Sequence, residues 1–148
     1  MNILFIGPYR QMDGWGHAAQ DYIRALLTTN NNIAIRPIFL ARSISTDPLH
    51  PDILQAENNS FDRADVIIQK ALPPYLRKTE SADRNIGLCV FETNNLKHTG
   101  WVRYLNFMDD VMVPSKYEKT SLLKHNKITS NIHVVNEPID ISKYKSAQ

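Results

Sequence analysis

Residues 86–124, IGLCVFETNNLKHTGWVRYLNFMDDVMVPSKYEKTSLLK, carry the clearest alternation of predicted strands and helices in this chain. The stretch opens with an apolar run at residues 86–91, which predicts a buried strand. Four side chains then recur at the i, i+3, i+4 and i+7 spacing of one helix face, and these are Trp101, Tyr104, Leu105 and Met108. A second apolar run at residues 111–113 predicts the next strand. This alternation indicates parallel strands, whose loops at the carboxyl ends form a ligand crevice.

A further helix is predicted directly after Pro114, because Ser115 and Glu118 have the spacing of a capping box. In that motif the hydroxyl accepts a hydrogen bond from the third helical N–H, and the carboxylate accepts one from the N–H of the cap residue. Ser115 is therefore expected to cap a helix whose start faces the crevice.

The rest of the chain repeats this alternation. Apolar runs predict strands at residues 3–6, 33–40, 65–69 and 132–135, and further helices are predicted at residues 17–28 and 51–57. Pro37 is expected at the end of its strand or on an edge strand, because it cannot donate a ladder hydrogen bond. The expected fold class is α/β, a Rossmann-like parallel sheet with helices on both faces.

Composition narrows the class of protein. The 148 residues are 43% hydrophobic and 22% charged, with a formal net charge of +2, as in an ordinary globular domain. Lys and Arg residues are interspersed with Asp and Glu, so a nucleic-acid-binding surface is not expected. The histidines show no metal-ligand spacing with Cys or Asp, and the single cysteine, Cys89, lies inside an apolar run. We therefore expect no metal, no cofactor and a buried, unreactive thiol.

The apolar runs and the first residues of the chain bear on its cellular location. No apolar run approaches the ~20 residues that cross a bilayer, so no transmembrane segment is expected. The first residues enter a strand directly and lack the basic start and long apolar run of a signal peptide. The cytoplasm is the expected location, and peripheral contact with a membrane surface is left open.

Several short motifs within residues 86–124 occur in an order that carries a resemblance. They are Phe91-Glu92-Thr93, Trp101-Val102, Leu105-Asn106-Phe107-Met108-Asp109 and Val113-Pro114-Ser115. In this order and spacing the chain resembles the N-terminal domain of GT-B glycosyltransferases, of the large retaining group called family 4 (group 1 glycosyl transferases). Residues 134–140, VVNEPID, resemble the family segment where the chain leaves that first domain, although Pro138 is displaced from the family position.

The resemblance implies the acceptor-side half of an enzyme. Residues 1–137 would form the N-terminal Rossmann-like domain, residues 138–148 would begin an interdomain linker, and the C-terminal donor-binding domain would lie outside this chain. The implied reaction transfers a hexosyl group with retention from a UDP- or GDP-linked sugar, which is a substrate and not a cofactor, to a sugar or glycolipid acceptor.

The implied partner is the C-terminal GT-B domain, in the same or a separate chain. In the family that domain holds a Glu-x7-Glu motif and the basic residue for the diphosphate, so this chain alone is expected to be inactive. The alternative is a Rossmann-like module that binds a nucleotide, a sugar or a protein without catalysis.

Candidate site residues follow the first strand. Gly14, Trp15 and Gly16 are predicted to form a loop, in which glycines let the backbone approach a ligand. The resemblance places this loop beside the donor phosphates, and a tight turn without a ligand is the alternative. Asp13 is expected to cap the following helix or to contact a sugar hydroxyl, and His17 stands at the junction of loop and helix. Trp15 lies off any helical stripe and is a candidate for stacking on a sugar or base.

More candidates follow two later strands. Lys70 is either a ligand for an anionic group or a plain surface lysine. Glu92, Thr93 and Asn94 are acceptor-side or loop-organising candidates, because short polar side chains at a strand's carboxyl end can hydrogen-bond a sugar; a solvated loop is the alternative. Trp101 is expected in the core, since it belongs to the helical stripe. No catalytic residue is assigned.

Overall fold

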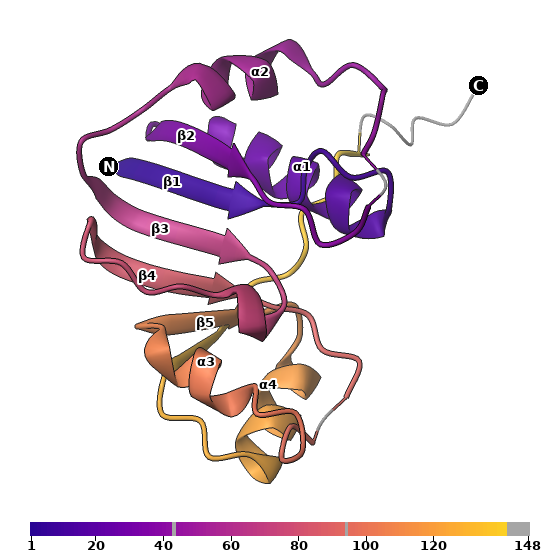
Figure 1. The fold of residues 1–148 in the computed structure, drawn as a ribbon, viewed down its shortest axis with the longest axis vertical. Helices are drawn as coiled ribbons and strands as arrows, with labels where there is room; N and C mark the ends of the chain where they lie inside the picture. The colour runs from indigo at the N-terminus through magenta and orange to yellow at the C-terminus, as the bar shows by residue number, and fades with distance from the viewer. Residues whose placement is uncertain (43, 94, 142–148) are drawn as a thin grey trace.

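The described residues form one six-stranded parallel sheet, which confirms the predicted fold class. The computed structural model describes residues 1–42, 44–93 and 95–141. The strands pair in the order β2-β1-β3-β4-β5-β6, and every pairing is parallel (Figure 1). Their bounds are β1 Asn2–Gly7, β2 Asn32–Pro37, β3 Ala64–Lys70, β4 Ala82–Leu88, β5 Asp110–Val113 and β6 Asn131–Val134.

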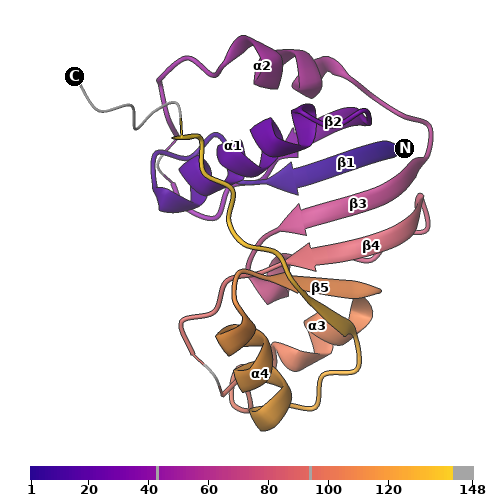
Figure 2. The ribbon, with the colours of Figure 1, turned by 180° about the vertical axis from the view of Figure 1, so that it is seen from behind.

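Helices cover both faces of the sheet. They are α1 Gly14–Leu27, α2 Pro51–Asn58, α3 Val102–Phe107 and α4 Lys116–His125, with a 3-10 turn, η1, at Pro73–Tyr75. Figure 2 shows α1 lying over β1 and β2 on one face, and Figure 1 shows α3 on the opposite face beside β5. The helix α2 packs along the edge strand β2 and against α1, while α4 packs near β5 and β6.

The alternation of side chains along the strands divides the core between these layers. Ile3 and Phe5 of β1 face α1 and pack with Ile23 in one cluster. On the opposite face, Val111 and Val113 of β5 pack in a second cluster, which α3 and α4 supply with Leu105 and Leu122. A sheet buried on both sides needs apolar runs in its strands, which is the pattern in the sequence.

Several predicted boundaries are wrong: β2 ends at Pro37 and not at residue 40, and the errors at β4 and α1 affect the site. The strand β4 begins at Ala82 and ends at Leu88, whereas the apolar run predicted residues 86–91. The strand begins with the exposed, polar Asp83 and Arg84 directly after Ala82, so its first half contains no apolar run that the sequence pattern could detect. The helix α1 begins at Gly14 and not at His17, because Asp13 caps it. The predicted position of Pro37, last in the edge strand β2, is confirmed.

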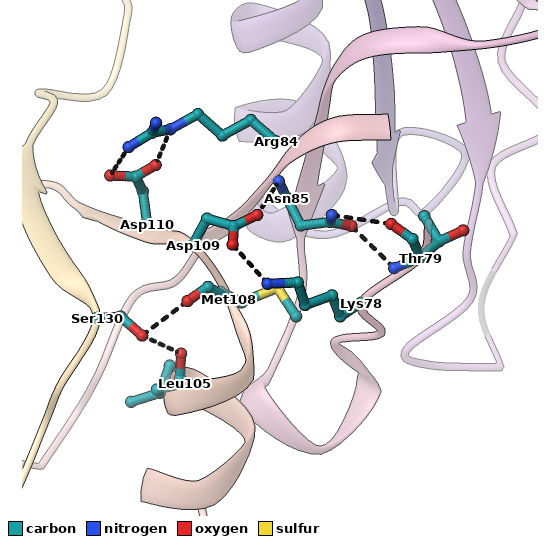
Figure 3. Close-up of polar contacts among 9 residues, drawn as sticks. All are labelled: Lys78, Thr79, Arg84, Asn85, Leu105, Met108, Asp109, Asp110 and Ser130. Carbon is teal, nitrogen blue, oxygen red and sulfur yellow. Dashed lines mark hydrogen bonds and ion pairs between the residues drawn. The ribbon is translucent and has the colours of Figure 1, made fainter. Parts of the chain in front are cut away.

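Polar side chains hold the amino ends of β4 and β5 (Figure 3). The buried Asn85 amide donates to the carbonyl oxygen of Thr79 at 3.0 Å, and its oxygen accepts from the Thr79 N–H at 3.0 Å. The Asp109 carboxylate accepts from the Asn85 N–H at 2.8 Å and pairs with Lys78. Beside them, both oxygens of Asp110 accept hydrogen bonds from Arg84. This end of the sheet is therefore tied together by structural ion pairs.

The strand order places the expected ligand crevice at the other end. The chain steps from β1 to β2 on one side and then returns past β1 to β3, after which every strand is added on the other side. In doubly wound sheets ligands bind outside the carboxyl ends of the strands at such a reversal, which here lies between β1 and β3. Among the helices of the described residues, none is long and apolar enough to span a membrane.

Candidate functional site

An open cavity of about 720 Å³ lies outside the carboxyl ends of the central strands. Its lining comes from the start of α1, the ends of β3 and β4 and the segment after β6, and consists of Gly14, Trp15, Ala18, Lys70, Leu72, Val90, Glu92, Thr93, Trp101 and Glu137. Five of the residues predicted from the sequence as site candidates meet here: Gly14, Trp15, Lys70, Glu92 and Thr93. Glu137 was not among the candidates.

The predicted glycine loop is the first turn of α1. The Asp13 carboxylate accepts a hydrogen bond from the Gly16 N–H at 3.0 Å, so Asp13 is the N-cap, one of its two predicted roles. Gly14 and Trp15 line the cavity, whereas Gly16 is buried against the backbone of Gln11. Gly14 therefore belongs to the cavity wall, whereas Gly16 allows close packing on Gln11. Phosphate binding by this turn stays a prediction.

Lys70 is the most unusual residue of the cavity. It ends β3 and is only 1% exposed, so the prediction of a plain surface lysine is wrong. Its ammonium nitrogen lies 5.1 Å from the ring centre of Trp15 and 5.3 Å from that of Tyr22. The Oε1 atom of Glu137 is 3.8 Å away. Burial lowers the pKa of the Lys70 ammonium, and the nearby Glu137 charge partly opposes that shift.

Glu137 reaches the cavity because the segment after β6 crosses back over the sheet toward α1 (Figure 2). Side chains of α1 hold this segment: the Tyr22 hydroxyl lies 3.5 Å from the Val135 carbonyl oxygen, and Arg24 pairs with Asp140. Glu137 lies within residues 134–140, the segment quoted for the resemblance, but nothing in that segment marks it as a site residue. The one usable signal is its place after the last strand of a parallel sheet, because the carboxyl ends of all such strands meet at one edge.

Only some of the candidate residues in the loop after β4 line the cavity. Glu92 and Thr93 are exposed, and they line both the main cavity and an adjoining pocket of about 390 Å³ at the start of α4. Trp101 also lines the main cavity while its ring packs 6.4 Å from that of Phe91, so its predicted core role holds only in part. Asn94 lies outside the described residues, and the exposed His17 is not part of the cavity lining.

Ser115 performs the predicted half of the capping box. Its hydroxyl accepts a hydrogen bond from the Glu118 N–H at 3.1 Å. The carboxylate half is wrong: Glu118 accepts from the Phe91 N–H instead and so fixes the loop after β4. Burial raises the pKa of the Glu118 carboxyl, and the charge of Glu137 adds to the effect. Glu118 lines the smaller pocket together with Ser115.

Taken chemically, the cavity offers two indole surfaces, one buried ammonium group and carboxylates on its rim. Aromatic faces suit the apolar face of a sugar ring or a base, and the polar groups suit hydroxyl or anionic substituents. Within the described part of the chain, no three His, Cys, Asp or Glu side chains gather as a metal site. Cys89 is fully buried, and burial raises the pKa of its thiol to about 12, so it is no nucleophile.

The sequence matches no protein-family model and no curated protein. The case for a function therefore rests on the fold, on the cavity and on the motifs of the sequence.

Proposed function

We propose that this chain is the N-terminal, acceptor-side domain of a nucleotide-sugar-dependent glycosyltransferase that transfers a hexosyl group with retention. The observation that carries the proposal is the cavity at the strand reversal, where Trp15 and Trp101 stand among hydroxyl and carboxylate groups. An aromatic wall with convergent polar groups is the chemistry that recognises a sugar. The motif resemblance adds the reaction class, and it concerns the same loops.

The roles follow from position. Trp15 offers a ring for the acceptor sugar, while Glu92 and Thr93 offer acceptors and a donor for its hydroxyl groups. Lys70 adds the one positive charge of the lining. We propose no catalytic residue in this chain, because departure of a nucleoside diphosphate needs a positive clamp, which the resemblance assigns to a second domain.

Acceptor binding gives the first test. Saturation-transfer NMR with methyl hexosides at millimolar concentration should show transfer from the chain to the sugar ring, and Trp15→Ala should remove it. Phe107→Ala is the matched control, because Phe107 is an exposed aromatic residue on α3 and is no part of the cavity lining. Equal signals from the parent and Trp15→Ala chains would count against a sugar site in this cavity.

The donor side gives the second test. Titration of UDP- and GDP-hexoses into the 148-residue chain should give a Kd near or above ~1 mM, a binding free energy of roughly 4 kcal/mol or less, since most donor contacts are assigned to the other domain. Added Mg²⁺ or Mn²⁺ should change little, and no sugar transfer should occur. Micromolar, cation-dependent binding or turnover by this chain alone would contradict the proposal. Sugar binding that never supports transfer with any donor domain would favour the non-catalytic module.

A further inference from the structure

We propose that Lys70 is an anion-binding residue of the cavity and that Glu137 is its built-in competitor. A ligand carrying a phosphate or carboxylate group would take the place of the Glu137 carboxylate beside the Lys70 ammonium. The ligand class is thus an anionic small molecule. The narrower class, an anionic sugar, rests on the proposed function; the anion site itself does not.

The Lys70 ammonium group is buried and only weakly paired. Lys70 is 1% exposed, and a charged side chain with so little exposed surface needs a close partner. Its described ion pair spans 3.8 Å, longer than the 2.7–2.9 Å of a good charge-assisted hydrogen bond. The Glu137 side chain is 45% exposed, so water competes for its carboxylate. The ammonium therefore retains capacity for a closer anion.

The neighbours of the Lys70 ammonium group leave one side from which an anion can approach. The rings of Trp15 and Tyr22 stand within 5.1 and 5.3 Å of the ammonium nitrogen and stabilise its charge through their faces. An aromatic face accepts no anion, so an incoming anion must approach from the side that Glu137 now occupies, which opens on the cavity lined by both Lys70 and Glu137. A carboxylate already stands at this position, which shows that an anionic group fits.

The amino end of α1 contributes its helix dipole to the same cavity. Its first turn, with Gly14 and Trp15, lines the same cavity as Lys70. The amino end of a helix favours negative charge, and so does a buried ammonium group. Opposing them are the carboxylates of Asp13, which caps α1, of Glu92 on the cavity rim and of Glu118 in the adjoining pocket. The anion is therefore expected to bind at Lys70 and not along the rim.

The experiment follows the only two tryptophans, Trp15 and Trp101, which both line the cavity and report binding by fluorescence. Sodium phosphate is titrated at fixed ionic strength against sodium chloride. Glu137→Gln keeps the side-chain shape and removes the competing charge, so phosphate should bind about three- to fivefold more tightly, as expected for relief of one partly exposed charge interaction. Lys70→Met should weaken phosphate binding at least about tenfold.

Lys78→Met is the matched control, because Lys78 pairs with Asp109 at the opposite end of the sheet, and its phosphate affinity should equal that of the parent chain. Weaker or unchanged binding in Glu137→Gln would overturn the proposal, and this result does not depend on whether Lys70→Met folds. Equal loss in Lys78→Met would also overturn it, since binding would then be a general charge effect.

Glucose, glucose 6-phosphate and glucuronate separate the sources of the anion. Preference for the two anionic sugars over both glucose and free phosphate supports an anionic acceptor. Binding of phosphate alone supports the anion site and contradicts the proposed sugar function. Binding of glucose without any preference for charged forms keeps the proposed function and overturns the anion site.

Discussion

Gly16 packs directly on the main chain of Gln11: a β carbon added to Gly16 would lie 2.1 Å from the carbonyl oxygen of Gln11. Neither group is the end of a flexible side chain, so the start of α1 or the preceding loop would have to shift. We expect Gly16→Ala to lower the free energy of unfolding by about 2 kcal/mol or more, the usual effect of overpacking. Urea unfolding followed by circular dichroism measures this loss.

Gly14→Ala is the control for that experiment. An added β carbon at Gly14 meets no atom within 4 Å, and alanine is the better helix former. Its stability should equal or slightly exceed that of the parent chain. Equal stability of Gly16→Ala and the parent would show that the close contact with Gln11 carries no energetic weight.

The cap of α4 gives a second prediction. The Ser115 hydroxyl accepts from the Glu118 N–H, and Ser115→Ala leaves that N–H without the bond. The loss should be about 1 kcal/mol of stability, measured by urea unfolding. Thr120→Ala, at an exposed position within α4, should leave stability the same or slightly higher. Poor ligand binding by Ser115→Ala at full stability would assign the hydroxyl to the neighbouring pocket instead.

The Asp110 carboxyl makes the free energy of unfolding depend on pH in the acid range. Hydrogen bonds from Arg84 and contact with His133 lower its pKa from 3.8 to about 2. A carboxyl with a lowered pKa in the folded state stabilises the protein above its ordinary pKa, and this contribution disappears as the pH falls from about 4 to about 2. Asp110→Asn should therefore be less stable than the parent at pH 7, and the difference should shrink toward pH 2.

Thermal unfolding across that pH range measures the difference. Asp62→Asn, at an exposed position before β3, should differ little from the parent throughout. A gap between parent and Asp110→Asn that stays constant down to pH 2 would mean that the carboxylate charge contributes nothing.

The thiol of Cys89 gives a fourth prediction. It is fully buried after β4, its hydrogen points at the Ala71 carbonyl oxygen 3.3 Å away, and burial raises its pKa to about 12. At pH 8 the native chain should react with an aromatic disulfide reagent at least ~100-fold more slowly than the urea-unfolded chain, because the thiolate and its access are both suppressed. Rapid labelling of the native chain would show that the strand end opens readily.

Local pattern was sufficient for the elements. Apolar runs predicted all six strands, and the cap at Ser115 predicted the start of α4, whereas the start of α1 was predicted three residues too late. These predictions are correct because a strand buried on both faces and an N-cap each depend on neighbours within a few residues. The errors fall where neighbours in space decide: the polar start of β4 is paired to β3, and the Glu118 carboxylate turns to the Phe91 N–H.

The sequence pattern was enough to predict a parallel α/β sheet and five candidate residues at its carboxyl edge. The burial of Lys70 against the rings of Trp15 and Tyr22, with Glu137 beside it, depends on the folded chain. A periodic pattern records which side chains leave water, because that depends on the local repeat. It cannot record which charges meet, because Lys70 and Glu137 are distant in sequence and come together only when the segment after β6 crosses back to α1.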